Sequence, residues 1–224
     1  MDLGLMCANI AKLWTNYWHI YLIEGVLTTL KLTVFAVVLG ALLGVVVAML
    51  KMSKSKIIRF LITAYIEIIR GTPLLLQLML FYFVLPELIP IFDFSEFTWV
   101  AIALCINSSA YVSEIFRSGI QSVDKGQTEA ARSLGLSSGQ TMLRIVMPQA
   151  IKNILPALGN EFIMMLKETS LASTFFIGDL MTSHLIVKGA TFLMLESLII
   201  TGVIYFCMTY PLSKLVEAFE RKMK

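Results

Sequence analysis

One stretch of the sequence restricts the possible folds more than any other. From Val26 to Leu50 it carries a single charged side chain, Lys31. A helix of about 20 predominantly apolar residues crosses the hydrocarbon core of a bilayer, so this stretch is long enough to span a membrane. The whole chain is 58% hydrophobic and only 15% charged, whereas soluble domains are about 45–50% apolar and about 25% charged. The sequence therefore predicts a multi-pass membrane protein.

Four further apolar segments follow, and we expect all five to be membrane-spanning helices. Their approximate ranges are 26–50, 57–85, 97–119, 148–170 and 192–215. The second is interrupted at Gly71-Thr72-Pro73, because Pro73 has no amide hydrogen for the carbonyl of Ile69 and Gly71 loosens the same turn. Irregular backbone at membrane depth is tolerated where it lines a cavity or is buried in protein. The expected fold is one all-α transmembrane domain over residues 1–224.

Charged residues between the spans predict the orientation, since cytoplasmic loops are enriched in Lys and Arg. Basic residues follow the first and fifth spans: Lys51, Lys54, Lys56, Arg59, Lys214, Arg221, Lys222 and Lys224. The connection after the second span carries only acids: Glu87, Asp93 and Glu96. We therefore expect an outside N-terminus, a cytoplasmic C-terminus and an outer interfacial segment over residues 1–25. Lys31 is expected to reach the outer interface, and Gly40 and Gly44 to allow close helix packing.

The segment 124–148 is unusually polar for its surroundings and falls on the cytoplasmic side. Asp124 is a good N-cap, and Gly135 suits the left-handed position that ends a helix. Ser137 and Gln140 form a capping box that begins a second helix, and Pro148 suits the first turn of the next span. The pattern predicts a helical hairpin. It is typical both of an ordinary amphipathic hairpin at the membrane surface and of a docking element for a cytoplasmic partner.

The same segment resembles the EAA motif of ABC-importer permeases, in which EAA is followed by Gly and then by Ile-x-Leu-Pro at fixed spacings. The matching residues are Glu129, Ala130, Ala131, Gly135, Ile145 and Pro148, with Met147 in place of Leu. Three further stretches resemble the polar amino acid permeases of the histidine/glutamine type. They are EIIRGTPLLLQ, AYVSEIFRSGIQSVDKGQ and LPALGNEFIMMLKETSL. The resemblance covers most of the chain from about Gly25 onward.

This resemblance implies a fold like that of type I ABC importers, with 124–148 as the coupling loop seated on an ATP-hydrolysing subunit. The residues expected to couple the two subunits are Glu129, Ala130, Ala131, Gly135 and Leu136, with Ala131 facing the ATPase. The chain has no phosphate-binding G-x-x-x-x-G-K-[ST] loop. We therefore expect no cofactor in this chain and ATP to be bound by a separate subunit.

Ionisable residues inside spans are costly and are candidates for the translocation site. Glu67 and Arg70 share a helix face near mid-depth of the second span, and Asn160 and Glu161 lie near mid-depth of the fourth. The resemblance adds Gln77, the last residue of the matching stretch EIIRGTPLLLQ. We expect these five to bind substrate. The alternative for Glu67 and Arg70 is an internal ion pair that only holds helices together.

The remaining polar residues in the spans have more ordinary expectations. Three neighbours in the third span are expected to form interhelical hydrogen bonds: Asn107, Ser108 and Ser109. Three others, closer to the cytoplasm, are expected to act in gating or packing: Tyr111, Glu114 and Arg117. His184 is expected in an outer loop without a partner. The cysteines Cys7, Cys105 and Cys207 are expected to pack, since no Cys/His spacing indicates a metal site.

Together these features predict a permease subunit of an ATP-driven importer of a polar amino acid, located in the cell membrane. The expected partners are two ATP-binding-cassette subunits, a second copy or a related permease, and an extracytoplasmic amino acid-binding protein, but no nucleic acid. Three alternatives remain: a membrane-embedded enzyme, a passive channel and a non-transport membrane scaffold. An enzyme would need a nucleophile–base pair or metal ligands, and we expect none. The sequence leaves open which amino acid is carried.

Overall fold

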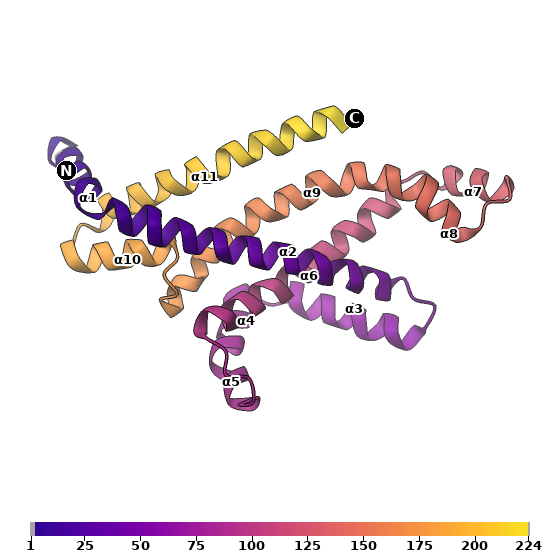
Figure 1. The fold of residues 1–224 in the computed structure, drawn as a ribbon, viewed down its shortest axis with the longest axis horizontal. Coiled ribbons are helices and arrows are strands. Elements are labelled where there is room, and N and C mark those ends of the chain that lie inside the picture. The colour runs from indigo at the N-terminus through magenta and orange to yellow at the C-terminus, as the bar shows by residue number, and fades with distance from the viewer. Residues whose placement is uncertain (1–2, 224) are drawn as a thin grey trace.

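The computed structural model describes residues 3–223, and this part of the chain is helical without strands (Figure 1). Three of its helical segments are long and apolar enough to cross a membrane, and there are five if each of two bent helix pairs counts as one span. The predicted all-α fold with five spans is confirmed on that count. Met1, Asp2 and Lys224 lie outside the described residues, and so do both ends of the predicted domain.

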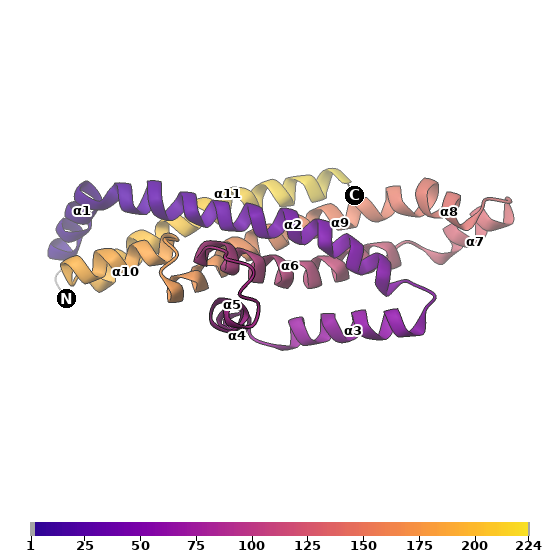
Figure 2. The same ribbon diagram turned by 60° about the horizontal axis from the view of Figure 1, so that its bottom comes forward.

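The first span is the C-terminal part of a longer helical segment. α1 (Leu3–His19) continues through a π-helical turn, η1 (Ile20–Val26), into α2 (Leu27–Lys51). Figure 2 shows α1 turned away from the axis of α2. Gly25 permits the close packing of this turn on α10 (Leu180–Thr191), because a Cβ there would lie 2.9 Å from the Cα of Leu180.

α2 and α6 (Glu96–Gln121) form the central helix pair. A Cβ on Gly40 would lie 2.7 Å from the Cβ of Ser108, and one on Gly44 would lie 2.7 Å from the Cβ of Val112. The predicted role of both glycines in close packing is confirmed. Because both numbers rise together along the contact, the two helices run in the same direction. The predicted third span therefore crosses the membrane in the same sense as the first.

The second span is broken where the sequence predicts it. α3 (Lys56–Gly71) ends at Thr72, and α4 (Leu74–Met79) begins after Pro73. A π-helical turn, η2 (Leu80–Val84), and the short α5 (Leu85–Leu88) follow, and the two halves meet at 106°. The side chain of Gln77 donates to the Ile69 carbonyl at 2.7 Å and to the Thr72 carbonyl at 3.2 Å. It supplies the hydrogen bond that Pro73 cannot make.

The polar segment between the third and fourth spans is the expected helical hairpin, and it projects from one end of the molecule (Figure 1). α7 (Lys125–Ser133) begins at Asp124, whose carboxylate accepts from the amide of Gly126. Gly135 has a φ of 85°, and the amide of Leu136 donates to the carbonyl of Ala131. This pattern is the Schellman ending expected of a left-handed glycine.

α8 (Ser138–Thr141) begins at the predicted capping box. It continues through the π-helical turn η3 (Met142–Val146) into α9 (Met147–Glu168), where Pro148 occupies the first turn. The short 3₁₀ helix η4 (Thr169–Phe175) follows. The predicted fourth span is therefore the membrane part of one long, gently interrupted helical rod.

The connection between the fourth and fifth spans contains a helix that the sequence analysis missed. α10 (Leu180–Thr191) precedes α11 (Met194–Met223). The expectation that His184 lies in an outer loop without a partner is wrong. His184 is on α10, is 2% exposed, and lies with its Nδ1 2.9 Å from the hydroxyl of Ser197. α10 is only 12 residues long, too short to register as a span.

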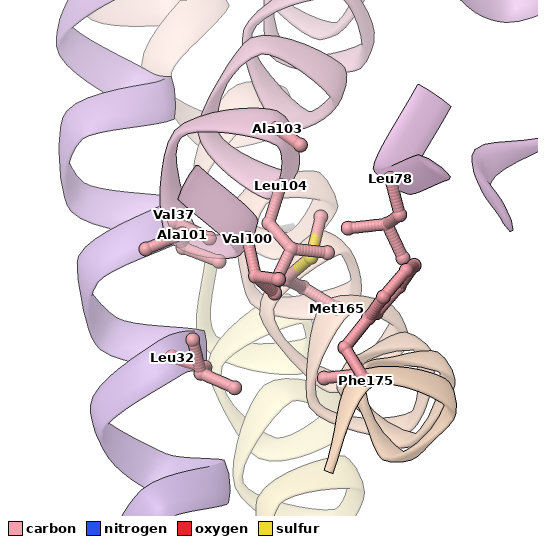
Figure 3. Close-up of a cluster of buried hydrophobic side chains, with 11 residues drawn as sticks. Leu32, Val37, Leu78, Val100, Ala101, Ala103, Leu104, Met165 and Phe175 are labelled. Atoms are coloured by element: carbon pink, nitrogen blue, oxygen red, sulfur yellow. The ribbon is translucent and has the colours of Figure 1, made fainter. Parts of the chain in front are cut away.

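The main apolar core joins α2, α6 and α9 to the broken second span (Figure 3). Its buried side chains include Leu32, Val37, Leu78, Val100, Leu104, Met165 and Phe175. A second core joins α1 and η1 to α10 and α11 and includes Leu13, Tyr21, Leu180, Val187 and Ile200.

Candidate functional site

A cavity of about 310 Å³ opens between α3, α6 and α9. It is lined by Arg70, Tyr111, Glu114, Ile115, Arg117, Ser118 and Glu161. The three helices reach this point because α6 packs along α2 through Gly40 and Gly44, while α9 packs against both α6 and α2. The cavity brings together charged side chains from the second, third and fourth spans. We take it as the candidate site.

Glu114 is the centre of a cluster of three cations. Its Oε1 accepts a 2.6 Å hydrogen bond from Lys51 Nζ, and its Oε2 lies 2.7 Å from Arg117 Nη2. Arg70 Nη1 lies 3.9 Å from the same Oε2, and its guanidinium is 5.3 Å from the centre of the Tyr111 ring. One carboxylate thus faces three cations, so the cluster carries an excess of positive charge. A bound anion would balance this positive charge.

Arg70 is the loosest member of this cluster. Its side chain is 44% exposed, compared with 19% for Lys51 and 34% for Arg117. Its contact with Glu114 is also the longest of the three, at 3.9 Å. A guanidinium held mainly over an aromatic ring retains free donors. Arg70 is therefore available to a ligand in the cavity.

Glu161 provides the negative side of the cavity. It is 3% exposed, and its Oε1 accepts a 3.1 Å hydrogen bond from the hydroxyl of Ser108. The position results from close packing of α6 and α9, where Gly119 leaves no room for a Cβ beside the side chain of Ile154. The cavity therefore combines a carboxylate from α9 with guanidinium groups from α3 and α6.

The predicted substrate residues are only partly brought together. Arg70 and Glu161 line the cavity, but Glu67 and Asn160 are exposed and do not line it. The alternative Glu67–Arg70 ion pair is not formed among the described residues; Arg70 pairs with Glu114 instead. The packing of α3 on α6 brings Arg70 to Glu114, which is distant in sequence from both Glu67 and Arg70.

Gln77 does not line the cavity and is hydrogen-bonded within the chain. It is 5% exposed, and its amide nitrogen donates to Ile69, to the Thr72 carbonyl and to the Thr72 hydroxyl. Its amide oxygen accepts from Asn107 Nδ2 at 2.9 Å. Both ends of the amide are engaged within the chain, so Gln77 fastens the broken span to α6.

The three polar neighbours of α6 form interhelical hydrogen bonds as expected. Asn107 bonds to Gln77, Ser108 to Glu161, and Ser109 Oγ lies 2.6 Å from the hydroxyl of Tyr65. The pairing of Lys51 with Glu114 was not predicted, because these two residues lie on different helices. A local signal existed only for Arg117, which lies three residues from Glu114 on one helix face.

The hairpin exposes some of the predicted coupling residues and buries another. Glu129 and Ala130 are exposed, as is Leu134 at 84%. Ala131 is only 4% exposed, so the expectation that it faces a partner is wrong. Its methyl group packs inside the hairpin, since α7 folds back on η3. Gly135 and the half-buried Leu136 shape the turn.

Within residues 3–223, no three His, Cys, Asp or Glu side chains lie close enough together to hold a metal ion. The cavity is lined by charged side chains of both signs. Opposite charges at separate walls suit the binding of a small ligand that carries both signs of charge.

Several known proteins are similar to this chain in sequence. Residues 36–224 match the model of the family described as binding-protein-dependent transport system inner membrane component. The arginine transport system permease protein ArtQ of Bacillus subtilis is 42% identical over 204 residues, covering 91% of this chain and 93% of ArtQ. The nopaline transport system permease protein NocM of Agrobacterium fabrum is 42% identical over 228 residues, covering 98% of this chain and 91% of NocM.

Two solved structures have the same fold. A crystal structure of an amino acid ABC transporter with histidines superposes with a TM-score of 0.88 at 49% identity, covering 93% of this chain and 96% of that chain. An inward-facing structure of the MetNI methionine ABC transporter superposes with a TM-score of 0.70 at 16% identity, covering 89% of this chain and 96% of that one. At that low identity the second comparison concerns the fold alone.

Proposed function

The chain belongs to the family of inner membrane components of binding-protein-dependent transport systems, and from this premise we propose that it is the permease subunit of an ATP-driven importer of a polar amino acid. The observation that carries the proposal is the cavity with Glu161 on one wall and the Arg70–Glu114–Arg117 cluster on another. An amino acid carries an ammonium and a carboxylate, and both need charged or polar partners once they leave water. The relatives described as arginine and nopaline permeases support this class of substrate.

In the proposed binding mode, Arg70 meets the substrate carboxylate and Glu161 meets a cationic group of the substrate. Arg70 is suited to this role because its contact with Glu114 is long and its side chain is partly exposed. Glu161 is suited because a carboxylate that is almost fully buried gains most from a cation. Glu114 and Lys51 then position the two guanidinium groups without contacting the ligand.

The proposal assigns ATP hydrolysis to a separate subunit that docks on the hairpin. Glu129, Ala130 and Leu134 present the outward surface, while Ala131, Gly135 and Leu136 hold the shape of the hairpin. The hairpin continues directly into α9, which carries Glu161. Movement of a docked subunit would therefore reach the cavity through a continuous helical rod.

The complete assembly in this proposal contains two ATP-binding-cassette subunits, a second copy or a related permease, and an extracytoplasmic amino acid-binding protein. The family description supports the binding protein. We place the N-terminus outside and the C-terminus in the cytoplasm. The separation of α1 and α10 from the α7–α8 hairpin, at opposite ends of the molecule in Figure 1, supports this orientation.

Reconstituted uptake tests the proposal. The intact complex in liposomes is assayed with radiolabelled amino acids, with and without ATP, across substrate concentrations. We expect Glu161→Gln to raise the apparent substrate constant about tenfold, since one charge-assisted hydrogen bond contributes about 1.5–3 kcal/mol. Glu67→Gln should have a smaller effect, because Glu67 lies outside the cavity lining. Glu87→Gln, in the exposed outer connection, is the matched control.

Two outcomes would contradict the proposal. Flux that does not depend on ATP would favour a passive channel. An unchanged uptake curve for a stably folded Glu161→Gln variant would remove this carboxylate from the substrate path and leave it as a packing partner of Ser108.

A further inference from the structure

The central helix pair indicates how deep each residue lies in the membrane. α2 and α6 run in the same direction, with Gly40 beside Ser108 and Gly44 beside Val112. At the cytoplasmic end of the pair, Lys51 bonds to Glu114. At the other end, Lys31 and Phe97 line one groove. The two helices therefore stay level with each other over the whole length between these lysines.

That length equals the thickness of the apolar part of a bilayer. Lys31 and Lys51 are 20 residues apart in one unbroken helix, or about 30 Å at 1.5 Å per residue. The hydrocarbon core is also about 30 Å thick. Lys51 ends α2 next to further basic residues, so Lys31 falls at the opposite boundary, where lipid headgroups begin. The first turn of α6 also lies at this outer boundary, since Phe97 directly follows an acidic residue of the outer connection.

A groove of about 530 Å³ opens beside Lys31. Its lining is Leu27, Leu30, Lys31, Val34, Phe35 and Phe97, so Lys31 is its only charged residue. Leu27 and Val34 are each 47% exposed and Phe35 is 37% exposed. Lys31 is also exposed. Among the described residues, its ammonium has no ion pair or hydrogen bond within the chain.

From this arrangement we infer that the groove binds an anionic phospholipid of the outer leaflet. One acyl chain lies on Leu30, Val34 and Phe35, and the phosphate accepts hydrogen bonds from Lys31 Nζ. The ammonium has three donors and no acceptor, which matches a phosphate with a net negative charge. A zwitterionic lipid brings its own cation to the same place and gains less. The apolar walls of the groove thus favour a lipid acyl chain, and the unpaired ammonium of Lys31 at headgroup depth favours a lipid with a negative charge.

The site goes beyond the proposed transport function and depends on it only for the choice of leaflet. It also lies on the opposite end of the α2–α6 pair from the Glu114 cluster. Lipid binding can therefore be measured without a transport assay, and a failure of one proposal leaves the other standing.

Native mass spectrometry of the intact complex tests the inference. The delipidated complex is titrated with phosphatidylglycerol or phosphatidylcholine, and the bound lipids are counted. We expect phosphatidylglycerol to bind in preference. Lys31→Gln should weaken its binding about tenfold, the loss expected for one charge-assisted hydrogen bond, and Lys31→Arg should retain it. Val34→Trp, which fills the groove, should weaken both lipids.

Lys12→Gln is the matched control, because Lys12 is an exposed lysine of α1 that does not line the groove. Equal phosphatidylglycerol binding by the parent and by Lys31→Gln would overturn the proposal. A second copy of the chain is the competing occupant. Efficient crosslinking between Lys31→Cys side chains of two copies in native membranes would show that protein covers the groove, and it would also overturn the proposal.

Discussion

The break in the second span depends on a single side chain, and replacing Gln77 with Leu should expose this dependence. Leucine has a similar size but no polar atoms. The substitution leaves the Ile69 carbonyl without the donor that replaces the missing amide hydrogen of Pro73. It also removes the acceptor of Asn107 Nδ2. Asn107 is 3% exposed, and its Oδ1 already has no partner within residues 3–223, so its whole amide would be unpaired.

Of the four hydrogen bonds that Gln77 makes, those to Ile69 and Asn107 determine the size of the effect. A buried donor or acceptor left without a partner costs about 1–3 kcal/mol. The Thr72 hydroxyl keeps its bond to the Ile68 carbonyl, so we expect the lower part of the combined range, about 2–4 kcal/mol. For a chain of this length each kcal/mol changes Tm by about 2–4 °C, so Tm should fall by roughly 4–16 °C.

A thiol-reactive fluorogenic dye can follow this unfolding. Cys105 is buried, whereas Cys7 and Cys207 are exposed. In a Cys7→Ser/Cys207→Ser background the dye therefore reports the opening of the core around α6. Gln149→Leu is the matched control, because its amide also bonds to a helix carbonyl but at an exposed position. The control should leave Tm within about 1 °C of the parent.

The competing hypothesis makes the opposite prediction. If Gln77 contacts substrate, Gln77→Leu should raise the apparent substrate constant for uptake while Tm stays at the parental value. That result would refute the positioning role. A Tm loss that is equally large in Gln149→Leu would show that the assay reports helix packing in general.

Three further predictions concern close packing, coupling and orientation. Gly44→Leu should lower Tm strongly, because a Cβ there would lie 2.7 Å from a side chain of α6, whereas Gly202→Leu, with nothing within 4 Å, should leave it unchanged. Gly135→Val should abolish substrate-stimulated ATP hydrolysis by the assembled complex, because φ at this position is 85°; Gly139→Ala is the control, and normal stimulation in both would contradict a docking role for the hairpin. In a cysteine-free background, Ser55→Cys between α2 and α3 should react with an impermeant maleimide only after the cells are opened, and labelling of intact cells would reverse the orientation.

Local patterns in the sequence predicted the membrane-spanning helices and several of the helix ends, but not α10. Apolar run length predicted the spans, because a bilayer core requires about 20 apolar residues whatever the tertiary fold. Pro73 predicted the break in the second span, and Gly135 predicted the turn of the hairpin. The capping box at Ser137 predicted the start of α8. Each acts through backbone geometry and hydrogen bonds within a few residues, so no distant part of the chain could overrule it.

The partners of charged and polar side chains were decided only by the tertiary structure. Arg70 is three residues from Glu67 yet pairs with Glu114, because α3 folds back beside α6. Ala131 lies in an exposed motif yet is buried, because α7 folds against η3. Likewise, α10 is too short to be recognised as a span and is held by contacts such as that between His184 and Ser197. Such contacts join residues that are distant in sequence, and their geometry exists only after the helices have packed.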